Sequence, residues 1–193
     1  MIVPMKLTLA LFALTLCAPA VAQKQVLETR EAGAATGNRG FDRLVREIRH
    51  ELIMLPFLSV FDDLSFRVEG YNVTLMGSVT RPTLKSDAEN RVKRIEGVEK
   101  LVNNIEVLPL SPMDDRIRVA TARMVFGHPS LNRYGIQAIP PIRIIVKNGN
   151  VSLEGIVANE TDKNIAGIEA NGVPGVFKVT NNLRVEQQQQ KKK

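Results

Sequence analysis

The stretch Asn-Val-Thr-Leu-Met-Gly-Ser-Val at residues 72–79 returns as Asn-Val-Ser-Leu-Glu-Gly-Ile-Val at residues 150–157. The register persists downstream, because two dipeptides recur at the same separation: Gly97-Val98 with Gly175-Val176, and Asn103-Asn104 with Asn181-Asn182. The ranges 66–107 and 144–185 align without a gap, and a match of that length indicates an internal duplication. We therefore expect two tandem small domains rather than a solenoid.

Hydrophobic periodicity predicts the order of elements in each repeat. In the first repeat, apolar residues at helical spacing precede Pro56, two strands flank a turn at Gly70-Tyr71, a helix follows Pro82, and a strand covers 98–107. The second repeat follows the same plan, with Asn148-Gly149 at its hairpin turn. The predicted fold class is α+β: two tandem small α-β-β-α-β domains, each a three-stranded mixed sheet packed on two helices.

Several small and polar residues receive structural interpretations. Gly77 and Gly155 interrupt their strands, which predicts either a bulge or close packing of the strand against a helix. Asn104 and Asn182 are expected to satisfy backbone groups at the sheet edge or to support the turn region. Thr80 is expected to cap the second helix of the first repeat, and Gly97 to end it in a left-handed conformation.

The N-terminus predicts a secretory signal peptide over residues 1–22, because a basic residue precedes a short apolar run and Ala20-Val21-Ala22 fits a cleavage site. Cys17 leaves lipidation as the less favoured alternative, since Leu16 stands where a small residue is usual. Cleavage would remove the only cysteine, so no disulfide is expected. The remaining boundaries follow from the repeat: flexible leader 23–40, first domain 41–108, linker 109–113, second domain 114–186 and disordered basic tail 187–193.

Charge and residue types argue against several classes of function. The formal net charge is +6, but much of the excess lies in Lys191–Lys193, whereas a nucleic-acid-binding protein concentrates basic residues on a domain face. The only histidines, His50 and His128, fall in different repeats, so no metal site and no cofactor are expected. The sequence offers no nucleophile motif and no phosphate loop. We therefore predict that the protein is not an enzyme.

The order of these motifs resembles the BON domain. In each repeat the hairpin Asn-Val-x-Leu-x-Gly-x-Val is followed by Gly-Val and then Asn-Asn, and the second copy, with Val173-Pro174-Gly175-Val176, matches more closely. The first copy departs from the pattern, because Glu96 stands where proline precedes Gly97. The resemblance implies a non-catalytic protein exported to the bacterial periplasm or envelope. The tandem arrangement is similar to that of osmotically induced periplasmic proteins and of outer-membrane lipoproteins that bind anionic phospholipid.

The segments that follow the first helix of each repeat are the candidate binding regions, because they are apolar and are expected at the surface. Aromatic and cationic side chains together suit an anionic membrane. The predicted lipid- or partner-binding residues are Arg116, Arg123, His128, Leu131, Arg133, Tyr134, Phe57 and Phe61. Two functions stay open: adsorption to anionic phospholipid in envelope or osmotic stress protection, and a protein–protein adaptor in an envelope or secretion assembly. The competing structural interpretation is that these side chains fill the core or the contact between the domains.

Overall fold

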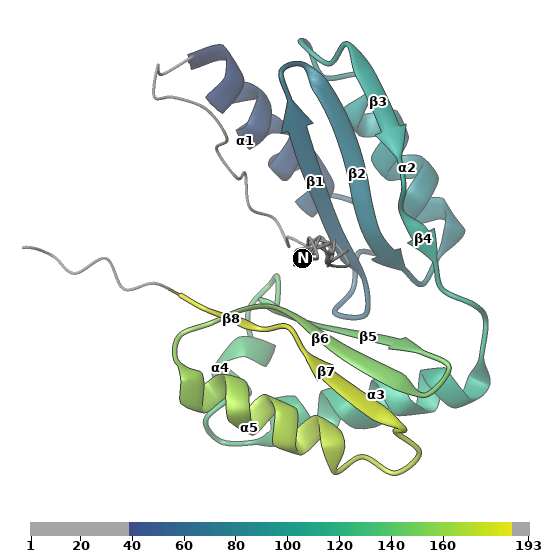
Figure 1. Ribbon diagram of the computed structural model, residues 1–193, viewed down its shortest axis with the longest axis vertical. Helices are drawn as coiled ribbons and strands as arrows, with labels where there is room; N and C mark the ends of the chain where they lie inside the picture. The colour runs from purple at the N-terminus through teal and green to yellow at the C-terminus, as the bar shows by residue number, and fades with distance from the viewer. Residues whose placement is uncertain (1–38, 187–193) are drawn as a thin grey trace, which may run out of the picture.

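The computed structural model describes residues 39–186, and the predicted signal peptide, almost all of the leader and the basic tail lie outside these described residues. Within 39–186 the chain forms two sheets, each with its own hydrophobic core, and the two units lie one above the other in Figure 1. This arrangement confirms the predicted α+β class with two tandem domains. In the described part of the chain, no helix combines the length and the hydropathy that a bilayer span needs.

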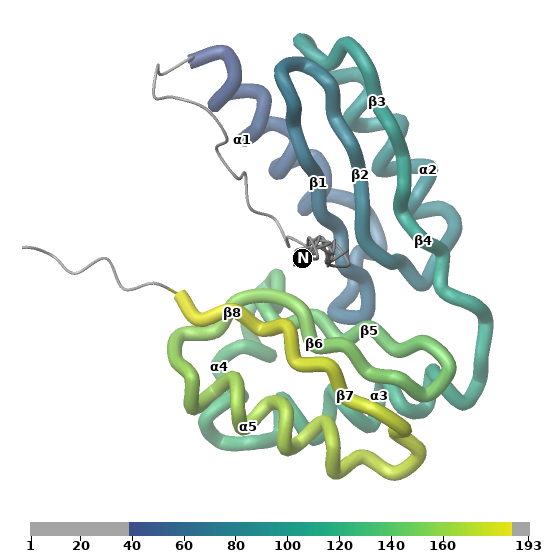
Figure 2. Tube along the Cα trace, viewed as in Figure 1, coloured from purple at the N-terminus to yellow at the C-terminus, as the bar shows by residue number. Residues whose placement is uncertain are grey.

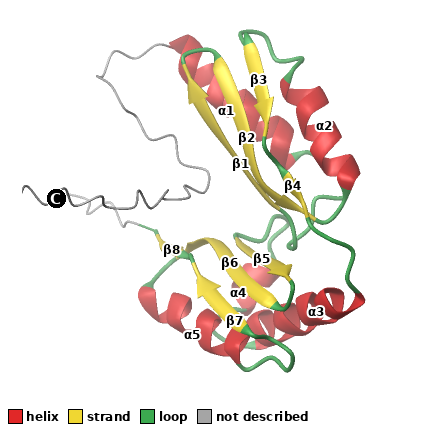
Figure 3. Ribbon diagram, turned by 45° about the vertical axis from the view of Figure 1, so that its right-hand side comes forward, coloured by secondary structure: helices red, strands yellow, loops and turns green. Residues whose placement is uncertain are grey.

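The first domain has two helices on one face of a mixed sheet. The hairpin of β1 and β2 is antiparallel, and β3 and β4 both run parallel to β2. Figure 3 shows α1 and α2 on the same side of this sheet. The elements are α1 Arg39–Ile53, β1 Asp63–Glu69, β2 Asn72–Val79, α2 Pro82–Val92, β3 Lys100–Asn103 and β4 Glu106–Val107. Helical spacing of apolar residues explains α1, whose buried side chains are Leu44, Val45, Ile48 and Leu52.

The second domain repeats the plan and adds one short helix. Its sheet has the same topology, with β5 antiparallel to β6, and with β7 and β8 parallel to β6. The extra residues of its first loop form α4, which the sequence did not predict. The elements are α3 Pro112–Gly127, α4 Asn132–Gly135, β5 Ile142–Lys147, β6 Asn150–Val157, α5 Glu160–Asn171, β7 Lys178–Asn181 and β8 Arg184–Val185.

The last strand of each repeat is broken by its Asn-Asn pair, so the predicted single strand becomes two. Asn103 donates through Nδ2 to the carbonyl of Lys85 (3.0 Å) and accepts through Oδ1 from the amide of Ile105 (3.2 Å). Asn181 makes the same two contacts with Lys163 (2.7 Å) and Leu183 (3.2 Å). The side chain thus satisfies the backbone where the ladder is interrupted. This role belongs to the first asparagine of each pair and not to the predicted second one, since Asn182 donates instead to Oε1 of Glu154 (2.7 Å).

At Gly77 and Gly155 the backbone of the neighbouring hairpin segment leaves no room for a Cβ atom. The glycines therefore do not serve packing of the strand against a helix, and that prediction is wrong. A Cβ on Gly77 would lie 2.1 Å from the carbonyl oxygen of Asp63, on β1. A Cβ on Gly155 would lie 1.8 Å from the carbonyl oxygen of Pro141, which immediately precedes β5. Both glycines also have positive φ, at 120° and 118°. They mark the place where each hairpin brings two backbones into close contact.

Two predicted helix caps are also wrong. The N-cap of α2 is Arg81, and Thr80 is instead held by Asp62, whose Oδ1 accepts from the Thr80 amide (2.7 Å) and hydroxyl (2.8 Å). Helix α2 ends at Val92, so Gly97 lies in the turn beyond it, although its φ of 96° is left-handed as expected. The caps of α3 and α5 are standard, because the side chains of Ser111 and Asn159 accept from amides of the first turn.

The two domains touch through the loop between α1 and β1. The amide of Ile144 on β5 donates to the carbonyl of Val60 (2.9 Å), and Arg143 donates to the carbonyl of Ser59 (2.9 Å). Lys147 of β5 forms an ion pair with Glu106 of β4. Figure 2 shows this loop descending from the first domain to the edge of the second sheet. The contact covers the exposed edge of β5, which would otherwise offer unpaired backbone groups.

Candidate functional site

The solvent-facing side of α3 carries two of the predicted binding residues. Buried side chains such as Ile117, Thr121 and Val125 hold the opposite side of the helix in the core. Arg116 and Arg123 lie two turns apart on the exposed side, with Val119 (42% exposed) between them. The side chains of Asp115, Arg116, Val119, Ala120 and Arg123 line a shallow hollow there. We call these five residues the α3 face.

The α3 face carries a net positive charge, because its acidic residue, Asp115, is paired with another arginine. Asp115 forms an ion pair with Arg118, a buried arginine that also donates to the carbonyl of Val146 (2.8 Å). Arg116 donates through Nε to the carbonyl of Pro112 (3.3 Å). Within residues 39–186, no acidic side chain forms an ion pair with Arg116 or Arg123. Two guanidinium groups are therefore directed to solvent beside an exposed valine.

Two side chains flank the α3 face and extend its apolar character. Met113 at the start of the helix is 55% exposed, and Met124 near its end is 43% exposed. Methionine is flexible and polarisable, so it adapts to irregular apolar surroundings such as lipid or a partner surface. The exposure of Met113 and Met124 could not be read from the sequence, because hydrophobic character alone does not distinguish the two sides of a helix at its flank.

Leu131 and Tyr134 are buried, so the expectation that they reach the surface is wrong. Leu131 has no exposed area, and Tyr134 is 5% exposed within the second core. The Tyr134 hydroxyl donates to Oδ2 of Asp162 (2.6 Å) and accepts from the amide of Ala158 (2.9 Å). The alternative that these side chains belong to the core is the correct one for both residues, and neither can contact a membrane in this conformation.

Arg133 is exposed, but its charge is already engaged. Its guanidinium donates to the Tyr134 hydroxyl (3.1 Å) and forms an ion pair with the buried carboxylate of Asp162. These contacts, with Tyr134 first and Asp162 second, raise the pKa of Arg133 above its usual value. His128 is half-buried at the end of α3, where its Nδ1 accepts from the amide of Ser130 (3.2 Å). Neither residue joins the α3 face.

Phe57 and Phe61 lie in the same loop but in opposite environments. Phe61 packs against the core of the second domain, so it fills the contact between the domains. Phe57 is 71% exposed, has a left-handed φ of 65°, and lies under the guanidinium of Arg81 at 5.2 Å from its ring centre. A bulky residue in this conformation is uncommon and is strained unless its surroundings compensate. Phe57 is therefore a second exposed feature that packing does not explain.

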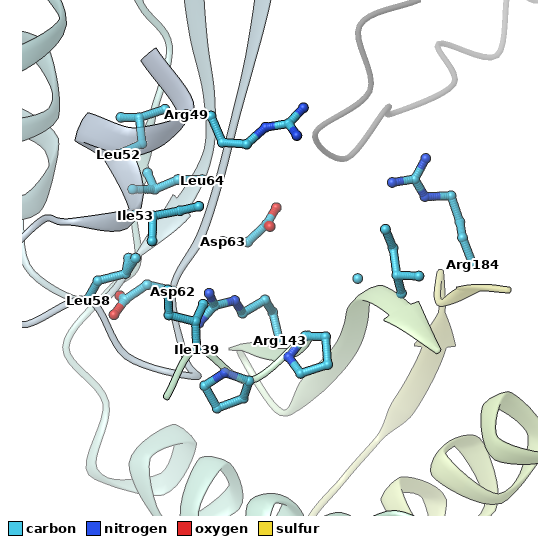
Figure 4. Close-up of a pocket in the computed structure, with 14 residues that line it drawn as sticks. Arg49, Leu52, Ile53, Leu58, Asp62, Asp63, Leu64, Ile139, Arg143 and Arg184 are labelled. Atoms are coloured by element: carbon cyan, nitrogen blue, oxygen red, sulfur yellow. The ribbon is translucent and has the colours of Figure 1, made fainter. Parts of the chain in front are cut away.

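A cavity that the sequence did not predict lies between the two domains. Its volume is about 250 Å³, and its walls come from α1, the following loop and β1 on one side, and from 139–143, 155–156 and Arg184 on the other. Figure 4 shows Arg49 and Arg184 on opposite sides of the cavity, with Asp63 on the side of Arg49. Such a site depends on how the domains pack together, which no local pattern in the sequence encodes. Among residues 39–186, no group of three His, Cys, Asp or Glu side chains could hold a metal ion.

Comparison with known proteins identifies the repeats. The BON domain matches this chain over residues 42–109 and 130–187. Two solved structures of CdsD, a structural protein of the type III secretion system of Chlamydia trachomatis, are also similar. The C-terminal domain is 12% identical over 79% of this chain and 100% of that chain; the other is 13% identical over 75% and 94%. Both TM-scores are 0.27, which supports no conclusion about function. None of the curated proteins matches this chain.

Proposed function

The chain belongs to the BON domain family, and on that premise we propose that it is a non-enzymatic binding module of the bacterial envelope. Its ligand in this proposal is the surface of a membrane rich in anionic phospholipid. The signal-peptide pattern of residues 1–22 supports export to the periplasm or another part of the envelope. Protection of the envelope under osmotic stress is the cellular role that the family resemblance suggests.

The α3 face is the single observation that carries the proposal. Arg116 and Arg123 present two cationic groups about 10 Å apart along the helix, and Val119 offers an apolar contact between them. Each basic residue near an anionic surface contributes about 1 kcal/mol. Two such contacts with one small apolar side chain give weak adsorption, which salt should weaken further because exposed charges are screened over about 8–10 Å. Lys191–Lys193 would add to the attraction.

The test is co-sedimentation of the mature chain with vesicles of phosphatidylcholine alone or mixed with phosphatidylglycerol. Binding should require phosphatidylglycerol and should fall as salt is raised from 50 to 500 mM. The double variant Arg116→Gln/Arg123→Gln should lose most of it. The matched control Arg46→Gln/Arg94→Gln removes the same charge from exposed positions in the first domain and should bind like the parent. Equal loss in both variants, or binding that ignores phosphatidylglycerol, would contradict the proposal.

The exposed and strained Phe57 favours a second candidate function, a protein–protein adaptor in an envelope assembly. Exposed aromatic side chains are frequent anchors in interfaces. Phe61 cannot test this function, because it packs on the second core and its removal would disturb the fold. Phe57→Gly is the informative variant, since glycine adopts φ of 65° without strain. It should keep the fold and the vesicle binding while abolishing capture of an envelope partner; retained capture would exclude the adaptor site.

A further inference from the structure

The cavity between the domains combines an apolar wall with a charged opening. Its apolar lining comes from both domains, and includes Leu52, Ile53, Leu58, Ile139, Pro141 and Ile156. Ile139 and Ile156 are each 43% exposed, so the cavity is open to solvent on this side. Concave sites with a largely apolar lining and a few convergent polar groups are the usual binding places for small molecules.

The charges that line the cavity are three arginines and two aspartates. Asp62 is fully engaged as an acceptor, because its carboxylate takes hydrogen bonds from the amide and hydroxyl groups of both Ser59 and Thr80. Arg143 lies beside Asp63 and Asp62 and donates to the carbonyl of Ser59. Burial lowers the pKa of Arg143, and the two carboxylates, with Asp63 the stronger, act against this shift. These three groups together carry a formal charge of −1, and Arg49 and Arg184 bring the lining of the cavity to +1.

The opening is left with a positive balance. Arg49 is exposed at the end of α1 and forms no ion pair or hydrogen bond that is recorded within residues 39–186. Arg184 approaches from the opposite domain (Figure 4). Guanidinium groups bind carboxylates with two parallel hydrogen bonds, which makes arginine the residue best suited to recognise this group. Three arginines against two aspartates favour an anionic ligand over a neutral or cationic one.

We propose that this interdomain cavity binds a small amphiphile with a carboxylate head and an unbranched apolar chain. The carboxylate meets the guanidinium of Arg49 at the opening, and the chain lies between Ile53 on one domain and Ile139 and Ile156 on the other. The volume limits the size of the ligand: a cavity of about 150 Å³ holds benzene. Scaling from its six carbon atoms gives about ten non-hydrogen atoms for 250 Å³. Octanoate has that size and is the probe of choice.

A ligand in this position would also hold the two domains together. Its chain would touch α1 and β1 of the first domain and the segments around Pro141 and Ile156 of the second. A ligand that binds only when both walls are in place stabilises their native arrangement by mass action. Octanoate should therefore raise the midpoint of thermal unfolding in a concentration-dependent manner.

The experiment titrates octanoate, below its micelle-forming concentration, into the mature ¹⁵N-labelled chain and follows amide chemical shifts. Octanol lacks the carboxylate, acetate lacks the chain, and octylamine reverses the charge. Octanoate should shift amides on both walls, and each of the other three probes should bind at least tenfold more weakly. Equal binding of octanol, or no octanoate shifts at 10 mM, would overturn the proposal.

Two single variants decide whether the cavity is the site. Arg49→Gln should weaken octanoate binding roughly tenfold, which corresponds to about 1.4 kcal/mol. Arg94→Gln removes the same charge from an exposed position just after α2 that does not line the cavity, and it should leave the affinity unchanged. Equal affinities in the two variants would refute the assignment. The Arg49→Gln variant should bind phosphatidylglycerol vesicles as the parent does. A result against the cavity proposal can therefore be distinguished from a result against membrane binding by the α3 face.

Discussion

Replacement of Gly155 by alanine should be among the most destabilising single substitutions in the second domain. Two costs add at this position. The φ of 118° lies in a region that is essentially restricted to glycine and costs roughly 1–3 kcal/mol for other residues. The new Cβ would also lie 1.8 Å from the carbonyl oxygen of Pro141, so the chain leading into β5 must move away.

The displacement has a further cost that can be worked from the contacts. The amide of Ile156 donates to the same Pro141 carbonyl at 3.3 Å, and this bond would be lost, at about 1 kcal/mol. We therefore expect a loss of about 2–4 kcal/mol in the free energy of unfolding for Gly155→Ala, from the sum of the conformational and hydrogen-bond costs. A loss of this size would leave a small domain close to its unfolding limit.

Two matched alanine variants separate the costs in urea unfolding of the mature chain. Gly70→Ala has a left-handed φ of 63° with open space around the new Cβ, so it should cost only about 1 kcal/mol. Gly127→Ala, at the end of α3, meets neither obstacle and should be neutral or stabilising by up to about 1 kcal/mol. If Gly155→Ala cost no more than Gly70→Ala, the close approach of the two backbones would not govern this position.

Two further predictions concern buried acceptors and amides. Asp62→Ala removes an acceptor of four hydrogen bonds and should lower the free energy of unfolding by about 3 kcal/mol, whereas Asp42→Ala, on the exposed side of α1, should change it by less than about 0.5 kcal/mol. Asn181→Ala removes both contacts at the break between β7 and β8 and should cost about 2 kcal/mol, while Asn164→Ala, exposed on α5, should be neutral or slightly stabilising. Chemical denaturation measures all four, and equal effects within either pair would contradict the assigned role.

The fold was predictable because its signals are local and occur twice. The alternation of β2 and β6, the turn at Asn148-Gly149 and the apolar side of α1 each depend on residues adjacent in sequence. The positive φ of Asn148 (51°) and Gly149 (73°) agrees with the predicted type I′ turn. Such local patterns predict helices, strands and turns correctly without knowledge of the rest of the chain.

The candidate site was less predictable, because exposure depends on long-range packing. Arg116 and Arg123 were predicted as binding residues because they neighbour the apolar loop of the second repeat, and both are exposed on α3. Tyr134 was misplaced because α4 folds its ring into the second core, which loop composition does not reveal. The interdomain cavity was missed for the same reason, since half its lining comes from each domain.

At one pair of equivalent positions, the two repeats supply different acceptors for the same backbone amide. Thr80 and Ala158 occupy equivalent positions, 78 residues apart, where the chain leaves the second strand of the hairpin. The amide of Thr80 donates to Asp62 (2.7 Å), whereas the amide of Ala158 donates to the hydroxyl of Tyr134 (2.9 Å). A backbone amide in such a position needs an acceptor, so each loop must supply one.

The choice of acceptor determines where each loop lies. Asp62 is short and reaches the amide from the main chain beside β1, which leaves Val60 and Phe61 to contact the second domain. Tyr134 is long and must enter the core to reach its amide, which draws α4 inward. The loop of the first repeat therefore contacts the second domain, whereas the loop of the second repeat places its tyrosine inside the core of its own domain. Duplication preserved the hairpin, and the loops took on different structural roles.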